Sequence, residues 1–219
     1  MVAGPTASHA LICLHGFGSA GDDLITLAPA LQLTLGNLGE SSEGAPPFSL
    51  AIYSPNAPAH APGERGYQWF RDMGWTFRDA DGLTRLTPDL DAFIGHVTAA
   101  HAIPTANIAI LGFSQGAMTI LHALPALTNR PAAVISCSGA LTVVPSFPTN
   151  PNPQPILFLH GQDDDVLPAD TSVKAAEIFA AHGYPTQLEI LPDLGHGIDN
   201  RALAHIAVFL QTLWAPVTL

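Results

Sequence analysis

The sequence predicts an α/β fold in which helices flank a mostly parallel central sheet. Short apolar runs without polar alternation, such as residues 108–111 (IAIL), are typical of parallel strands covered on both faces. Between these runs, apolar residues recur every three or four positions, which is the spacing of amphipathic helices. Strands and helices alternate along almost the entire chain, without an internal repeat. We therefore expect a single sheet wrapped by helices.

The expected elements follow one another in a regular order. Strands are predicted at residues 9–14, 48–53, 108–111, 132–137, 155–159 and 186–191. Helices are predicted at residues 24–35, 86–101, 117–124, 169–182 and 200–213, with Thr87 as a cap and Pro88 at the first position of the second helix. Long loops are expected at residues 36–47, 54–88 and 144–155, the last of which contains five prolines.

Size and composition restrict the function classes. A length of 219 residues suits one domain, 1–219, with a single core. The formal charge of −11 arises from 18 acidic and 7 basic residues without a basic patch, which argues against nucleic-acid partners and anionic membranes. No apolar run approaches the roughly 18 residues of a membrane span, so we expect no stable membrane insertion and a cytoplasmic location. Cys13 and Cys137 lie in apolar runs and are expected to be reduced structural thiols.

Residues 112–116 (GFSQG) lie between a predicted strand and a predicted helix. Gly-x-Ser-x-Gly in this context predicts a nucleophile elbow, in which Ser114 occupies a strained turn and glycines permit close backbone approach. The helix behind it would offer backbone N–H donors and the positive end of its dipole to an oxyanion. The alternative is an ordinary strand-to-helix turn in which Ser114 caps the helix.

A serine nucleophile needs a base, most often a histidine that a carboxylate orients. His196 fits best, because it follows a predicted strand and lies between two glycines. The acid is expected in the loop before it, but spacing alone does not choose among the three adjacent residues Asp163, Asp164 and Asp165. A solvated loop with no catalytic acid is the alternative.

A second glycine-rich loop, residues 15–18 (HGFG), follows the first predicted strand. The backbone N–H of Phe17 is a candidate second oxyanion donor. His15 at the end of the strand is better explained as a buried imidazole that orients the loop than as a base. His160, just before the acidic loop, is expected to support that loop.

Aromatic residues gather in the long loop after the second strand, and they include Trp69, Phe70, Trp75 and Phe77. Such residues could form the wall of a substrate pocket, since α/β sheets bind ligands beyond the carboxyl ends of their strands. They could equally anchor the loop to the core. For Trp69 and Phe70 both interpretations stay open, whereas Trp75 and Phe77 are expected to be anchors.

Taken together, these segments resemble the phospholipase/carboxylesterase family of α/β-hydrolases, which includes bacterial carboxylesterases and acyl-protein thioesterases. The matching stretches are residues 14–24 (LHGFGSAGDDL), 55–58 (PNAP), 68–70 (QWF), 112–117 (GFSQGA), 137–139 (CSG), 160–168 (HGQDDDVLP) and 195–198 (GHGI). The resemblance implies the α/β-hydrolase fold without a separate cap domain.

The resemblance also implies site residues. It places the nucleophile on Ser114, the base on His196 and the oxyanion donors on Phe17 and Gln115. The pattern His-Gly-x-x-Asp-x-Val-x-Pro selects Asp164 as the acid, with Asp163 as the reserve. The substrate pocket is expected to include Gln68, Trp69, Phe70 and Leu167. Asp165 replaces a residue that is often proline in relatives.

The expected function is a serine carboxylesterase acting on short to medium acyl chains, without a metal or cofactor. Its partner would be a small-molecule ester or thioester, and assembly into a homodimer is left open. Within the family, thioester hydrolysis and lysophospholipid cleavage are alternatives that the sequence does not separate. A binding module whose catalytic residues have decayed is an alternative of another class. A cysteine nucleophile is disfavoured, because the elbow position holds Ser114.

Overall fold

The structure is a computed structural model that describes residues 7–40, 49–63, 66–71, 80–149 and 152–214. For residues 37–40 and 80–81 it describes the backbone alone. The strands are β1 (His9–Leu14), β2 (Leu50–Tyr53), β3 (Ala59–His60), β4 (Tyr67–Gln68), β5 (Ile108–Phe113), β6 (Ala133–Cys137), β7 (Ile156–Gly161) and β8 (Thr186–Leu191). The helices are α1 (Gly21–Ile25), α2 (Ala28–Glu40), α3 (Ala80–His101), α4 (Gln115–Ala123), α5 (Asp170–Ala181) and α6 (Asn200–Trp214), with short 3₁₀ turns η1 (Thr105–Asn107) and η2 (Leu124–Ala126).

Six parallel strands form the central sheet, in the order β2-β1-β5-β6-β7-β8. The strands are apolar because both faces of the sheet are covered, as the unbroken apolar runs predict. In β1, five of the six residues are buried, and all six residues of β7 are buried. The α/β fold expected from the sequence, a parallel central sheet flanked by helices, is confirmed. All the strand carboxyl ends meet at one edge of this sheet, where the candidate site lies.

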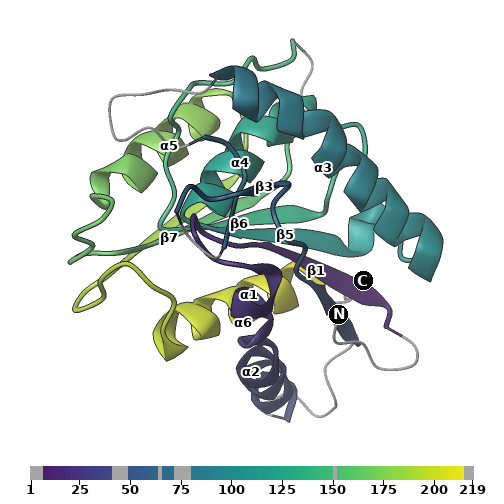
Figure 1. Ribbon diagram of the computed structural model, residues 1–219. Coiled ribbons are helices and arrows are strands. Elements are labelled where there is room, and N and C mark those ends of the chain that lie inside the picture. The colour runs from purple at the N-terminus through teal and green to yellow at the C-terminus, as the bar shows by residue number, and fades with distance from the viewer. Residues whose placement is uncertain (1–6, 41–48, 64–65, 72–79, 150–151, 215–219) are drawn as a thin grey trace.

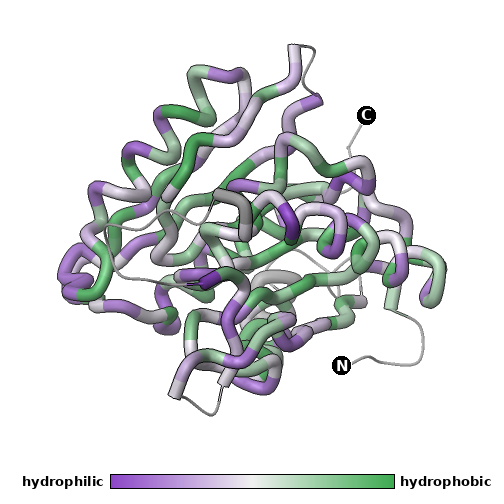
Figure 2. The backbone as a smooth tube through the Cα atoms, turned by 45° about the horizontal axis from the view of Figure 1, so that its top comes forward, coloured by the Kyte–Doolittle hydropathy of each residue, from purple (hydrophilic) through white to green (hydrophobic). Residues whose placement is uncertain are grey.

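Helices cover the two faces in separate layers (Figure 1): α3, α4 and α5 lie on one side of the sheet and α1, α2 and α6 on the other. Each layer has its own core, and alternate residues of a strand contribute to different cores. In β7, for example, Phe158 packs toward α5 while Leu159 packs toward α6. Hydrophilic and hydrophobic segments alternate along the helices (Figure 2), which is the expected pattern of amphipathic helices.

The first helical segment differs from the prediction. Residues 24–35 were expected to form one helix, but α1 ends at Ile25 and α2 begins at Ala28. Helix α2 then continues to Glu40, into the segment predicted as a loop. An interior glycine costs only about 1 kcal/mol of helix stability, and no proline interrupts this segment until Pro46. The rest of the predicted loop and Phe48 lie outside the described residues.

Helix α3 also begins earlier than predicted. It starts at Ala80 rather than at residue 86, so Pro88 lies inside the helix. Thr87 is not a cap, because its hydroxyl donates to the Leu83 carbonyl one turn earlier. The apolar stripe extends through Leu83 and Leu86, both buried, on the amino-terminal side of the proline. Burial of this stripe outweighs the cost of about 3 kcal/mol that an interior proline imposes.

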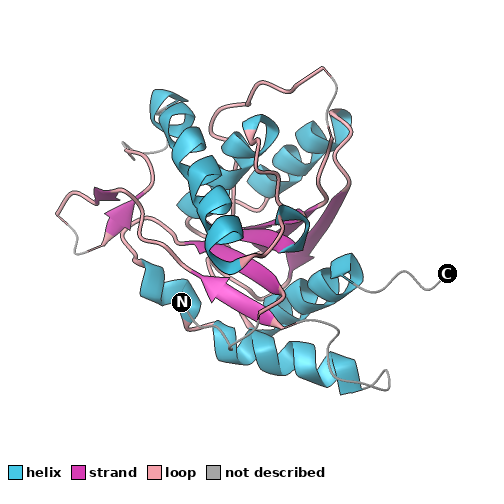
Figure 3. Cartoon of the chain, turned by 90° about the vertical axis from the view of Figure 1, so that its right-hand side faces the viewer, coloured by secondary structure: helices cyan, strands magenta, loops and turns pink. Residues whose placement is uncertain are grey.

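The long loop after β2 contains structure that the sequence did not reveal. Strands β3 and β4 form a two-residue antiparallel pair beside the main sheet (Figure 3). The pair connects to the first glycine-rich loop, since Ser19 bridges to Tyr67 and the Gly18 N–H donates to the Tyr67 carbonyl at 2.9 Å. Trp75 and Phe77, predicted as anchors, lie outside the described residues.

Candidate active site

Ser114 occupies a sharp turn between β5 and α4. Its backbone angles, φ 51° and ψ −114°, lie in a region that residues with side chains rarely adopt, so the turn is strained. The flanking glycines are required: a Cβ on Gly112 would collide with the backbone of Ala117, and one on Gly116 would collide with the Leu14 carbonyl oxygen. Ser114 precedes the first helical residue, but its side chain forms no capping hydrogen bond. The turn therefore has the geometry of a nucleophile elbow rather than that of a capped helix start.

Two backbone N–H groups lie close to this turn. Gln115 is the first residue of α4, so its N–H has no acceptor within the helix. Within the described residues, the N–H of Phe17 also has no hydrogen-bond acceptor. The loop that carries Phe17 runs alongside the elbow, because a Cβ on Gly16 would lie 3.5 Å from the Cβ of Ser114. Both predicted oxyanion donors are thus near the turn.

Asp164 is the buried member of the three adjacent aspartates. Its exposed fraction is 8%, whereas Asp163 and Asp165 are exposed. One carboxylate oxygen, Oδ1, accepts the N–H groups of Val166 and Leu167 at 3.0 and 2.8 Å. Burial alone would raise the pKa of Asp164, but these N–H groups and His196 outweigh it and lower the pKa. Burial, and not spacing, therefore distinguishes Asp164 from its neighbours.

His196 lies in the loop between β8 and α6. Its Nδ1 is 2.7 Å from Oδ2 of Asp164, and its ring lies 4.9 Å from the ring of Phe113, the residue before Ser114. Among the described residues, no hydrogen bond joins His196 to Ser114. Hydrogen bonds between a nucleophile and its base are often long without substrate and shorten in the substrate complex. The structure therefore brings the acid and the base together, beside the turn that carries the serine.

His15 is structural, as predicted. Its side chain is buried, Nδ1 lies 2.7 Å from the Gly16 carbonyl, and Nε2 accepts the N–H of Ala57 at 3.0 Å. Since both ring nitrogens are occupied, neither can serve as a catalytic base. Burial lowers the pKa of His15, which keeps the imidazole neutral. Asn56, the residue before Ala57, accepts the N–H of Gly21 with its side-chain oxygen. This bond also connects the loop after β2 to the start of α1.

The side chain of Gln115 has a role that the sequence did not suggest. Oε1 accepts the N–H of Trp69 at 2.8 Å, and Nε2 donates to the Phe70 carbonyl at 2.9 Å. The indole of Trp69 donates to the His15 carbonyl, also at 2.8 Å. The aromatic segment is therefore anchored to both loops that carry the N–H donors. No local pattern could have revealed this contact, because its partners are about 45 residues apart.

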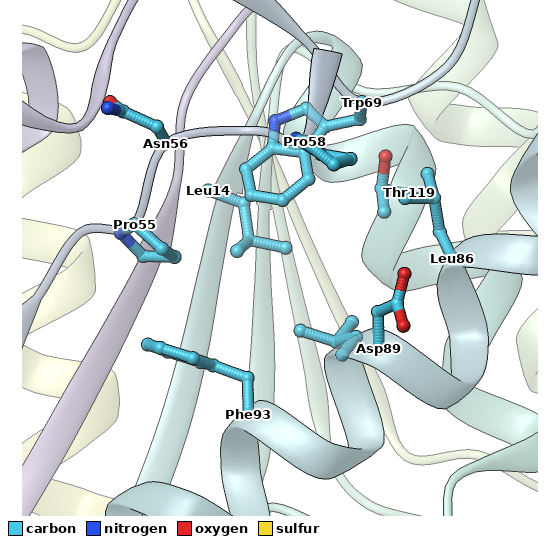
Figure 4. A pocket seen from close by; sticks show the side chains of 10 residues that line it. Leu14, Pro55, Asn56, Pro58, Trp69, Leu86, Asp89, Phe93 and Thr119 are labelled. Carbon is cyan, nitrogen blue, oxygen red and sulfur yellow. The ribbon is translucent and has the colours of Figure 1, made fainter.

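Two cavities adjoin the anchored tryptophan. The first, of about 260 Å³, lies between the loop after β2 and helix α3 (Figure 4), with Trp69 over Leu14 and with Asp89 and Phe93 on the helix side. The second, of about 670 Å³, is more polar and includes Gln68, Trp69, Phe70, Arg71 and Arg85 in its lining. Trp69 is thus both an anchor and a wall.

The predicted pocket residues divide in two groups. Gln68, Trp69 and Phe70 line cavities, whereas Leu167 is buried and lines neither. Among the described residues, Ser114 and His196 also line neither cavity. Leu167 instead acts through its backbone, whose N–H donates to Asp164 and whose carbonyl faces His160.

The described residues contain no cluster of three or more His, Cys, Asp or Glu side chains placed to hold a metal. Across the same ranges, none of the helices combines the length and apolar character that crossing a bilayer requires. Cys13 and Cys137 are buried free thiols, as predicted. Burial raises the pKa of Cys13 to about 12, so this thiol stays protonated.

The family model described as phospholipase/carboxylesterase matches residues 3–214. The chain belongs to the phospholipase/carboxylesterase family. Members with related sequences include esterase YpfH of Escherichia coli (29% identity over 63% of this chain and 59% of the relative) and acyl-protein thioesterase 1 of Debaryomyces hansenii (27% identity over 94% and 91%).

A solved structure, that of esterase PE8, superposes with a TM-score of 0.75 at 30% identity and covers 95% of this chain and 94% of its own. The match spans only 59% and 49% of the length of the first two curated relatives. The words esterase and thioesterase in these names describe the relatives.

Proposed function

We propose that the chain is a serine hydrolase that cleaves carboxylic esters through an acyl-enzyme intermediate. The observation that carries the proposal is the 2.7 Å hydrogen bond between the His196 imidazole and the buried Asp164, beside the strained turn of Ser114. Ser114 is the nucleophile, His196 the general base and Asp164 the orienting acid. The N–H groups of Phe17 and Gln115 stabilise the oxyanion.

Acylation begins when Ser114 Oγ attacks the ester carbonyl carbon and His196 Nε2 takes the hydroxyl proton. The carbonyl oxygen becomes an oxyanion that accepts hydrogen bonds from the N–H groups of Phe17 and Gln115. The tetrahedral intermediate collapses when the C–O bond to the alcohol breaks, and His196 gives its proton to the departing oxygen. A water molecule then attacks the acyl-enzyme by the same route, which releases the acid and restores Ser114.

Asp164 supports the charge that His196 gains during each transfer. Its lowered pKa keeps the carboxylate ionised at neutral pH, so it can hold Nδ1–H in place and stabilise the imidazolium. The two backbone N–H donors to Oδ1 fix the carboxylate without competing for Oδ2.

The substrate we propose is a small-molecule ester with a short to medium acyl chain. The formal charge of −11 favours neutral or cationic substrates, since it would repel anions over the protein surface. Acyl thioesters are the second candidate class, because acyl-protein thioesterases are among the relatives. Absence of nucleic-acid partners, absence of stable membrane insertion, a cytoplasmic location and a homodimer remain predictions from the sequence.

Two series of substrates test the proposal: p-nitrophenyl esters and the matching acyl thioesters, each from two to twelve carbons. We expect hydrolysis of esters with a maximum of kcat/KM at short to medium chains. Ser114→Ala should lower kcat at least about 10³-fold and leave the unfolding transition in place. A variant with near-normal kcat would contradict the mechanism, and a wild type that binds esters without cleaving them would favour the binding-module alternative.

A further inference from the structure

Asp164 lies between two imidazoles, of which the proposed mechanism uses one. Its Oδ2 is 2.7 Å from Nδ1 of His196 and 3.1 Å from Nε2 of His160. The His160 side chain is completely buried, whereas that of His196 is 16% exposed. Only His196 can therefore meet a substrate, and His160 faces the carboxylate from the interior.

The neighbours of His160 determine which of its nitrogens carries hydrogen. Nε2 lies 2.8 Å from the Leu167 carbonyl and 3.1 Å from the Asp164 carboxylate. A carbonyl and an ionised carboxylate can only accept hydrogen bonds, so Nε2 must be the donor. The lone pair of an unprotonated Nε2 would face two negative oxygens inside the protein, which is strongly unfavourable.

The other ring nitrogen has a partner that suits this tautomer. Nδ1 lies 2.7 Å from the hydroxyl of Ser172, a fully buried residue on α5. Burial lowers the pKa of His160, so the ring is neutral and Nδ1 accepts the Ser172 proton. The Gly139 carbonyl, 3.1 Å from Ser172 Oγ, also lies 3.0 Å from the hydroxyl of Thr171, whose single proton it shares with the Pro168 carbonyl at 2.8 Å.

We propose that His160 is a positioning residue for the triad, which donates Nε2–H to the same carboxylate oxygen that receives His196, and that Ser172 holds it in this tautomer. This inference rests on the proposed hydrolase function. The Asp164 carboxylate has three N–H donors of its own, and it lies 3.1 Å from His160 Nε2, whose single N–H it shares with the nearer Leu167 carbonyl. The donors hold the plane of the carboxylate and therefore the direction of the His196 ring.

His160 should also weaken the electrostatic stabilisation that Asp164 gives to the imidazolium form of His196. A second N–H directed at Oδ2 shares its negative charge, so loss of this donor would bind the imidazolium form of His196 more strongly. The acid limb of the pH profile would then move to higher pH, since His196 would hold its proton longer. A residue with a purely structural role would lower the folded fraction but would not move this limb.

Other ionisable groups near His160 do not face it. Cys137 and Glu189 pair with Leu159 and thus point to the opposite side of the sheet from His160. Apart from Asp164 and Asp199, the charged residues on α5 and in the loops after β7 and β8 are exposed to solvent: Asp163, Asp165, Asp170, Lys174, Glu177 and Asp193. Asp199 is half-buried and pairs with Arg201. Asp164 and His196 are therefore the ionisable groups that His160 can influence.

The test compares pH profiles of kcat/KM for wild type, His160→Leu and His160→Gln on one p-nitrophenyl ester. Leucine cannot donate to Asp164, so we expect a loss of about 10- to 100-fold and an acid limb shifted to higher pH. Glutamine can place an amide N–H near the position of Nε2. His160→Gln should therefore recover most of the activity, and its acid limb should lie at the same pH as that of wild type. A profile of His160→Leu that matches wild type would overturn the proposal.

A matched pair on α5 tests the role of Ser172. Ser172→Ala removes the donor to His160, whereas Thr171→Ala removes a neighbouring hydroxyl that contacts Gly139 and Pro168 but not the imidazole. We expect a shifted acid limb only for Ser172→Ala, and this pair decides the question even if His160→Leu does not fold. Equal profiles for the two variants would count against the proposed tautomer.

NMR of ¹⁵N-histidine-labelled wild type provides a readout without kinetics, with His160 assigned by its missing signal in His160→Gln. We expect a protonated Nε2 and an unprotonated Nδ1, and the reverse would overturn the inference. If the wild type hydrolyses esters and Ser114→Ala does not, an unshifted His160→Leu profile refutes the positioning role alone. If the wild type hydrolyses none of them, the proposed function and this inference fail together.

Discussion

Two carboxylates in this protein are held by nearly the same set of donors. Oδ1 of Asp164 accepts the backbone N–H groups of Val166 and Leu167, and Oδ1 of Asp91 accepts those of Thr128 and Asn129 at 2.8 and 2.7 Å. In both, the second oxygen accepts hydrogen bonds from side chains. Burial would raise the pKa of each carboxyl, but the hydrogen bonds outweigh burial and lower it.

The difference lies in the groups that face the second oxygen. Asp164 faces imidazoles, one of which is partly exposed at the carboxyl edge of the sheet. Asp91, on α3, faces the hydroxyl of Thr128 and the amide of Asn129, neither of which takes up a proton near neutral pH. In both places the N–H donors therefore hold a negatively charged carboxylate. Such a carboxylate assists proton transfer only where an accessible base contacts its second oxygen.

The largest difference between the two carboxylates is expected in activity, when each is replaced by the isosteric amide in Asp164→Asn and Asp91→Asn. The amide at position 164 cannot hold Nδ1–H of His196, so kcat should fall about 10³- to 10⁴-fold. Asp91→Asn should leave kcat within about twofold, because Asp91 has no contact with the base. Steady-state ester hydrolysis measures both.

Asp163→Asn and Asp165→Asn are the matched controls for position 164, since both side chains are exposed on the same loop. They should retain most of the activity. Equal losses for all three aspartates would mean that the wrong acid has been assigned.

Substitution of Asp91 should affect the stability of the protein and not its activity. This carboxylate joins α3 to the segment after η2 through two backbone and two side-chain donors. Asp91→Ala should lower the free energy of unfolding by about 1–3 kcal/mol without changing KM. Urea unfolding measures the first and ester hydrolysis the second; an unchanged urea midpoint would show that these hydrogen bonds add nothing to stability.

The smallest effect concerns acid unfolding. Both carboxyls have pKa values below the ordinary 3.8, so the folded state binds their protons less tightly than the unfolded state. Their stabilisation is therefore complete above the ordinary value and is lost as the pH falls through the folded pKa. Asp91→Asn and Asp164→Asn should each reduce the decline in unfolding free energy below about pH 4. Acid unfolding curves parallel to wild type for both variants would contradict the lowered pKa values.

Much of the fold could be predicted from short apolar runs, because a parallel sheet covered on both faces leaves no polar alternation. The strands of the main sheet all occur near their predicted positions. The sequence does not reveal the start of α3, because Pro88 is typical of a first helical position, although Leu83 and Leu86 continue the buried stripe before it. Strands β3 and β4 were missed because two residues carry no detectable periodicity.

The candidate site was predictable only in part. Gly-x-Ser-x-Gly indicated the elbow because both glycines are sterically required, and chain order indicated His196. Spacing could not choose Asp164, since the choice depends on which aspartate is buried. The side-chain role of Gln115 and the contact between His160 and Ser172 depend on tertiary packing, for which the sequence offers no local signal.

Reaction with a fluorophosphonate probe, with the adduct located by mass spectrometry, tests the central claim most directly. The probe reacts with a serine only where a base and an oxyanion site activate it. The account predicts one adduct, on Ser114, with loss of ester hydrolysis in proportion to labelling and no adduct in Ser114→Ala. Retention of full activity after labelling, an adduct on another residue, or no reaction in a protein that hydrolyses esters would contradict it.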